Sequence, residues 1–263
     1  MCGIAGYSLS ASSRVERTLA AQALLAGIAE RGADAVGYAH RAPGEQIVVH
    51  KQRSGASALL AEIQIPASAT QVLVHVRDYT KGHPTISANN HPVRHGAVVG
   101  IHNGIIFNDE EILTEHGITR AEPEMTVDSE AIFALAEKTE GHAGALEELR
   151  GSMATAWLDE RHPDGVFLAR GVGRPVWLGR SRNETFFAST EAALGVVEHY
   201  LQIRLHKEEL PEGTLLAIER GRERSRQRFS PNRAFEEKPL PPVRAPHEGA
   251  FCLKRLAALA ALY

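Results

Sequence analysis

Short apolar segments of strand length recur along this 263-residue chain in closely spaced, hairpin-like blocks. β-branched and apolar runs separated by turn signals such as Ala42-Pro43-Gly44 predict strands at 4–9, 36–40, 46–51, 71–76, 97–101, 153–158, 165–169, 176–178, 185–188 and 213–218. Helical periodicity predicts helices at 14–30, 128–140 and 144–150, with another beginning near residue 191. Because strands and helices do not alternate strictly, the pattern favours α+β layers over a doubly wound parallel sheet.

Composition excludes several other classes of protein. Hydrophobic residues make up 43% of the chain and charged residues 23%, as in ordinary globular proteins. The net charge of -3 gives no overall attraction to nucleic acid or to a membrane surface. The N-terminus lacks the basic and apolar regions of a targeting signal, and the apolar stretch 256–263 is too short to span a bilayer. We therefore expect a cytoplasmic protein.

The second residue carries the strongest chemical signal. Cys2 and Cys252 are the only cysteines, so no disulfide framework is expected, and a free thiol at Cys2 implies a reducing compartment. Removal of Met1 would leave a cysteine with both a thiol and an α-amine that titrates at about pH 7.7–8.0, so nucleophile and base would share one residue. The alternative is that Cys2 is an inert thiol or a small buried apolar residue.

Three further segments supply what acyl transfer from an amino-acid amide requires. Arg77, at the end of a predicted strand, suits bidentate binding of an α-carboxylate. Asp128, at a predicted helix start, could hold an α-ammonium. His102-Asn103-Gly104 offers an amide side chain and a backbone N–H for a developing oxyanion, each worth about 3–4 kcal/mol in known oxyanion holes.

Each of these segments also has a purely structural interpretation. Arg77 could form a surface ion pair, and Asn103-Gly104 is a common turn signal. Asp128 could cap the helix that follows it.

Together these segments resemble the glutaminase domain of class II glutamine amidotransferases, which have an N-terminal nucleophile, and most closely the glucosamine-6-phosphate synthase type. The resemblance covers roughly residues 2–220. It rests on six short motifs in family order: Cys2-Gly3-Ile4, Arg31-Gly32-Ala33-Asp34-Ala35-Val36-Gly37, Arg77, Asn89-Asn90-His91-Pro92, His102-Asn103-Gly104 and Asp128-Ser129-Glu130.

The resemblance implies a four-layer αββα sandwich of the N-terminal nucleophile hydrolase type. It implies hydrolysis of L-glutamine to glutamate and ammonia without any cofactor, with Cys2 as nucleophile and its own amine as base. Asn103 and Gly104 would form the oxyanion hole, and Arg77 and Asp128 would bind the α-carboxylate and α-ammonium. Thr80 and Gly82 match the loop that closes the glutamine pocket.

The chain departs from the family pattern in two respects. Asp78 replaces a tryptophan and Lys81 a histidine of the pocket-closing loop. No synthase domain follows the match, so we expect residues 1–220 to be the glutaminase domain and a separate protein to accept the ammonia. The Arg/Pro-rich stretch from 221 is expected to be a linker, followed at 251–263 by a short amphipathic helix that docks on the body or on a partner.

Other interpretations stay open at this point. Histidines 75, 83, 91, 95 and 102 are dense, but their spacing fits no zinc pattern, so we expect no metal and interpret them as core and loop residues. A contact of the arginine-rich stretch with nucleic acid is the less expected alternative. Two alternative functions are an N-terminal-nucleophile amidohydrolase acting on other γ-glutamyl or acyl amides, and a catalytically silent regulatory or scaffold subunit.

Overall fold

The computed structural model describes residues 2–238 and 241–263. Through residue 115 its elements are β1 (Gly3–Leu9), α1 (Arg17–Ile28), η1 (Ala29–Arg31), β2 (Ala35–Arg41), β3 (Val48–Gln52), α2 (Ala56–Leu59), β4 (Gln71–Arg77), η2 (Ser87–Asn89), β5 (Val93–His95), β6 (Val98–Ile106) and α3 (Asp109–Glu115). From residue 130 they are α4 (Glu130–Lys138), η3 (Ala143–Glu148), β7 (Gly151–Asp159), β8 (Gly165–Arg170), β9 (Trp177–Arg180), β10 (Glu184–Ala188), α5 (Glu191–Leu201), β11 (His206–Glu209), β12 (Thr214–Glu219), β13 (Arg222–Arg228) and α6 (Pro246–Ala260).

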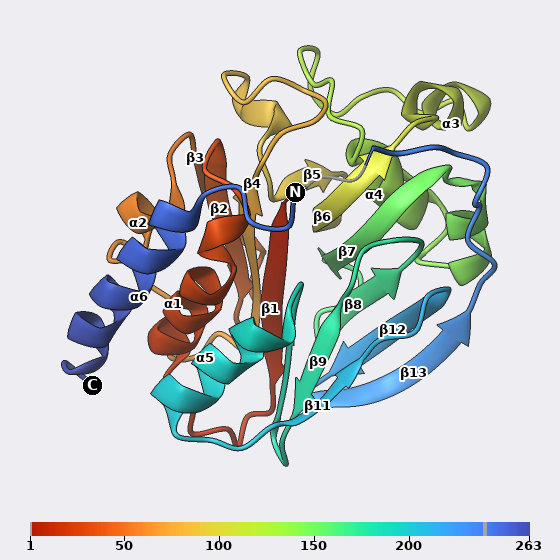
Figure 1. Cartoon of the computed structure of the whole chain (residues 1–263). Helices are drawn as coiled ribbons and strands as arrows, with labels where there is room; N and C mark the ends of the chain where they lie inside the picture. Colours follow the sequence, from red (N-terminus) through yellow and green to blue (C-terminus); the bar gives the residue numbers. More distant parts are fainter. Residues whose placement is uncertain (1, 239–240) are drawn as a thin grey trace.

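The strands form two antiparallel sheets that face each other (Figure 1). One sheet has the order β11-β9-β10-β1-β4-β2-β3, and the other β13-β12-β8-β7-β6-β5. Helices α1, α5 and α6 cover the outer face of the first sheet, and α4 covers that of the second (Figure 1). The structure thus has the four layers, helix, sheet, sheet and helix, that the resemblance implied.

Side chains along β1 alternate between two hydrophobic cores, one on each face of the sheet. Ala5, Tyr7 and Leu9 pack with α1 and α5, whereas Ile4 faces the second sheet. This is the period of two expected for a strand with both faces covered. Because β1 lies in the middle of its sheet, its first residues are held by neighbours on both sides.

The C-terminal part differs from the expected linker. The arginine-rich stretch is strand β13, which pairs with β12 along its whole length and forms the edge of the second sheet. A division of the chain at residue 220 would therefore fall inside a hairpin. Beyond it, the Pro-rich stretch leads to α6, whose Cys252 and Leu256 are buried in the core shared with α1. Glu248 of α6 also accepts hydrogen bonds from Ser57 of α2 at 2.7 and 3.0 Å.

Candidate active site

Strand register places Cys2 beside Arg77. Gly3 pairs with Val76 in the antiparallel β1–β4 ladder, so the residue before β1 lies opposite the last residue of β4. Arg31 donates a hydrogen bond from Nε to the Cys2 carbonyl at 2.9 Å, and the Cys2 thiol lies 3.5 Å from the Asp78 carbonyl oxygen. Two central strands therefore fix the thiol close to the guanidinium.

A small pocket opens at this point. Its lining comes from the residue before β1, the end of β4 and the loop after it, the segment before β5, strand β6 and the turn before α4. The lining residues are Cys2, Arg77, Tyr79, Thr80, Lys81, His91, His102, Gly104, Val127, Asp128 and Ser129. Five of the seven residues predicted from the sequence meet here. The other two, Gly82 and Asn103, do not line the pocket but adjoin residues that do.

Arg77 is almost fully buried and held on several sides. Its guanidinium donates to Asn90 Oδ1 at 2.6 Å, to the Lys81 carbonyl at 2.9 Å and to the Gly82 carbonyl. Burial lowers the pKa of Arg77, whereas the nearby Cys2 and Asp128 raise it. An arginine keeps its charge under such conditions, so the pocket holds a fixed cation.

Asn103 and Gly104 lie within β6, because this strand continues to Ile106, beyond the predicted range 97–101. Asn103 is fully buried, and neither its amide nitrogen nor its amide oxygen has a hydrogen-bond partner among the described residues. Gly104 has φ +148°, and a Cβ there would lie 1.9 Å from the Ser152 carbonyl oxygen. An unpaired buried amide beside a glycine that admits no side chain is a suitable arrangement of donors for an oxyanion.

Asp128 reaches the pocket from the turn before α4. It is not the cap of that helix, since α4 begins at Glu130 with Ser129 as its N-cap residue. The Asp128 carboxylate instead accepts the Ile106 N–H at 2.7 Å. Burial, and secondarily the Asp109 carboxylate, raise the pKa of Asp128 to about 6, against the lowering effects of the Ile106 N–H and of Lys81. The pocket therefore has an acidic group that titrates close to neutrality.

Burial shifts the pKa of the Cys2 thiol and the pKa values of the nearby histidines in opposite directions. Burial raises the pKa of the Cys2 thiol, although the Asp78 hydrogen bond and the Arg77 charge oppose it. Burial lowers the pKa of His75 and of His102 to about 3 each, so both are neutral near pH 7. The thiol therefore needs a base to become a thiolate, and these histidines are too weakly basic for that role.

His102 and His91 both line the pocket, and they come from different segments of the chain. His102 contacts Ser129 Oγ at 2.8 Å and the Ser152 carbonyl at 3.3 Å, which links β6 to β7 and to the start of α4. His91 stacks on His75 with ring centroids 4.2 Å apart, and its ring nitrogens have no partner among the described residues. Both are buried, as the interpretation of these histidines as core and loop residues implies.

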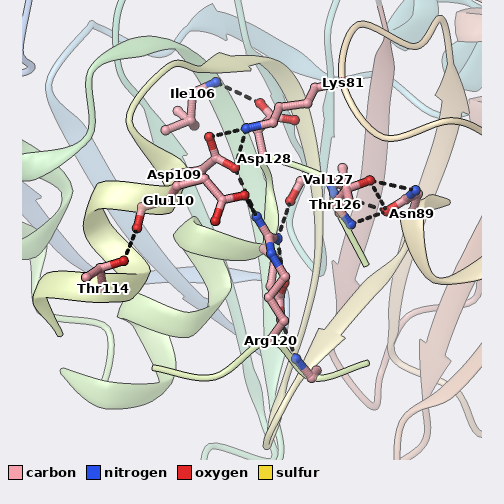
Figure 2. A network of polar contacts seen from close by, with 12 residues as sticks. Lys81, Asn89, Ile106, Asp109, Glu110, Thr114, Arg120, Thr126, Val127 and Asp128 are labelled. Atoms are coloured by element: carbon pink, nitrogen blue, oxygen red, sulfur yellow. Dashed lines mark hydrogen bonds and ion pairs between the residues drawn. The ribbon is translucent and has the colours of Figure 1, made fainter. Parts of the chain in front are cut away.

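Sequence patterns missed the polar network behind Asp128 (Figure 2). Asp109, at the start of α3, forms ion pairs with Lys81 and Arg120. Arg120 also forms an ion pair with Glu130 at 2.9 Å. No motif marks Asp109, because its role depends on where α3 packs. Lys81 stood out in the sequence only as a departure from the family pattern.

Neither a metal cluster nor a membrane-spanning helix occurs in the part of the chain that the structure describes. Residues 2–238 and 241–263 contain no group of three or more His, Cys, Asp or Glu side chains that could hold a metal ion. In the same ranges, no helix has the length and apolar character needed to cross a membrane.

Comparisons with known proteins agree with this geometry. Residues 76–195 match a family model described as a glutamine amidotransferase domain. The chain is 32% identical over 210 residues to the glutamine--fructose-6-phosphate aminotransferase [isomerizing] of Escherichia coli (strain K12), covering 74% of this chain and 32% of that protein. The enzyme of the same name from Chlamydia pneumoniae is 32% identical over 239 residues, covering 85% and 36%. The chain thus spans about a third of the length of these curated relatives.

Solved structures show the same fold. Glutamine phosphoribosylpyrophosphate (PRPP) amidotransferase from B. subtilis superimposes with a TM-score of 0.68 at 20% identity, over 88% of this chain and 50% of that one. The structure of the allosteric regulatory enzyme of purine biosynthesis gives a TM-score of 0.69, also at 20% identity and with the same coverage. The fold is that of the N-terminal nucleophile hydrolases, and the chain belongs to the class II glutamine amidotransferase domain family.

Proposed function

We propose that this domain hydrolyses L-glutamine to glutamate and ammonia through a γ-glutamyl thioester on Cys2. The observation that carries the proposal is the meeting of Cys2, Arg77, Gly104 and Asp128 at one small pocket, although they come from four separate segments of the chain. The Arg77 guanidinium and the Asp128 carboxylate suit the two charged groups of a free α-amino acid, and the Cys2 thiol suits attack on an amide carbonyl.

The proposed reaction has two steps. After removal of Met1, the α-amine of Cys2 takes the thiol proton, directly or through a water, and the thiolate attacks the glutamine δ-carbonyl carbon. Asn103 Nδ2 and the Gly104 N–H stabilise the oxyanion, and the protonated amine returns the proton to the leaving nitrogen, which departs as ammonia. Water, with the amine again as base, then hydrolyses the thioester and frees the thiol.

We further propose that the released ammonia passes to an acceptor enzyme on a separate protein. The relatives support the transfer itself, since their names describe passage of an amino group from glutamine to a second substrate. Co-purification with the tagged protein, followed by assay of the captured protein for ammonia-dependent synthesis, tests this part of the proposal.

A substrate panel distinguishes this function from those of other amidohydrolases. We expect glutamine to be hydrolysed at least about 100-fold more efficiently, in kcat/KM, than N-acetylglutamine, which lacks the ammonium and would leave the buried Asp128 carboxylate unpaired. γ-Glutamyl peptides serve as the third substrate, since they keep both α-groups but enlarge the leaving group. Equal rates for glutamine and N-acetylglutamine would contradict the assignment of Asp128.

Glutamine binding should weaken in acid. The pKa of Asp128 in the folded protein is raised to about 6, so the carboxylate that faces the ammonium is protonated as the pH falls through that value. Because glutamine itself does not titrate at roughly pH 5–7, Kd should rise below pH 6 and be constant above about pH 7. Calorimetric titration of the Cys2→Ala protein, which has no turnover, measures this directly. A Kd that is constant from pH 5 to pH 8 would contradict it.

A further inference from the structure

The loop after β4 is attached to α3 by one side chain. Lys81 Nζ lies 2.6 and 2.7 Å from the two carboxylate oxygens of Asp109, which is almost fully buried (Figure 2). Charge-assisted contacts are shorter and stronger than neutral hydrogen bonds, and removal of either partner would leave the buried carboxylate without this contact or the ammonium without its acceptor. The Lys81–Asp109 pair therefore fixes the position of the loop relative to the second sheet.

The backbone of the same residue reaches the opposite side of the pocket. The carbonyl of Lys81 accepts the Arg77 guanidinium at 2.9 Å, and Gly82 adds a second carbonyl contact. Residue 81 therefore links α3, through its side chain, to the arginine that is proposed to bind the substrate carboxylate. Displacement of Lys81 would change the surroundings of that arginine as well.

Charges around Asp128 provide the second observation. The charged side chains that influence it are Lys81 on the loop, Asp109 on α3 and Arg77 on β4, and Arg120 lies behind Asp109. Asp109 and Lys81 have opposite effects on the Asp128 pKa, since the carboxylate raises it and the ammonium lowers it. The ion pair thus places two opposing charges within reach of the same acid.

We propose that Lys81 is a positioning residue for glutamine, which holds the pocket-closing loop through Asp109 and offsets the charge of that second carboxylate beside Asp128. The inference rests on the proposed glutamine binding and adds a residue that departs from the family pattern. Lys81 acts through its neighbours and has no role in the bond-breaking steps.

The two halves of the ion pair should shift the pH dependence of binding in opposite directions. Lys81→Met removes a positive charge, so Asp128 should stay protonated to higher pH, and the acid loss of glutamine binding should move upward by several tenths of a pH unit. Asp109→Asn removes a negative charge and should move it downward. Loss of loop attachment alone would weaken binding in both variants without separating the two pH profiles.

The measurement is Kd for glutamine against pH by calorimetry, with Cys2→Ala as the parent and each substitution added to it. In the active enzyme, Lys81→Met should raise KM on the order of tenfold and change kcat much less. Lys81→Arg, which keeps the charge, should restore most of the affinity. Thermal unfolding checks that each variant is folded. If a single variant does not fold, the double variant Lys81→Met/Asp109→Asn takes its place, because it leaves no unpaired buried charge from this pair.

A second ion pair on the same helix provides the control. Arg150 and Glu111 form an exposed contact at 2.5 Å, so Glu111→Gln removes a charge from α3 outside the pocket and should leave Kd and its pH profile unchanged. If the parent binds no glutamine, the proposed function fails. If the parent binds glutamine but Lys81→Met and Asp109→Asn, each added to it, give the parent's Kd and pH profile, only the inference about Lys81 fails.

Discussion

Replacing Cys2 with alanine is expected to abolish glutaminase activity while leaving glutamine binding and stability close to those of the natural chain. The thiol is the only proposed nucleophile, and loss of a nucleophile in comparable hydrolases costs on the order of 10⁴-fold or more in kcat. Arg77 and Asp128 keep their positions, since β1 is fixed by Gly3 and the residues that follow it. Ammonia release and calorimetric Kd are the two measurements.

The other cysteine offers a matched control. Cys252 is buried against α1, away from the pocket residues, so Cys252→Ala should keep full activity. A glutamine-analogue electrophile should label natural protein and Cys252→Ala at one site, and should not label Cys2→Ala. Intact mass of the active protein should show loss of Met1. Unchanged ammonia release by Cys2→Ala would reject the mechanism, and active protein that retains Met1 would reject the α-amine as base.

Replacing Gly104 with alanine is expected to give the second largest effect. The new Cβ would lie 1.9 Å from the Ser152 carbonyl oxygen, at a φ of +148° that disfavours any side chain. Because Gly104 pairs with Met153, the β6–β7 ladder must shift, and the Gly104 N–H moves with it. We expect kcat to fall about 10²–10³-fold and the free energy of unfolding to fall by about 1–3 kcal/mol.

Gly44 serves as the control for the backbone part of this effect. It also has a positive φ, +77°, but no atom lies within 4 Å of the position that a Cβ would take, and it belongs to the β2–β3 turn. Gly44→Ala should therefore cost some stability and leave kcat unchanged. A Gly104→Ala protein with natural kcat would show that its N–H does not stabilise the oxyanion.

Local patterns predicted most of the layers, because burial on one or both faces leaves a clear period in the sequence. The run 71–76 is β-branched and is β4, one residue longer than predicted. The stretch 222–228 has no apolar alternation, and its residues are all exposed. Its strand conformation comes from pairing with β12, which a polar edge strand does not reveal in its own sequence.

The candidate site likewise has features that the sequence predicts and features that depend on tertiary structure. Sequence alone determined the chemistry that is present: a thiol at position 2, a guanidinium at 77, an amide and a glycine at 103–104 and a carboxylate at 128, in family order. Each of these groups is given by the residue type at one position, which can be read without knowing the fold.

Only the tertiary structure decided how these groups meet. The β1–β4 register sets Cys2 beside Arg77, and the packing of the two sheets brings β6 to them. The same packing places Asp109 beside Asp128 and joins it to Lys81, a contact between residues 28 positions apart. Such long-range contacts depend on the whole arrangement of sheets and helices, so no short stretch of sequence encodes them.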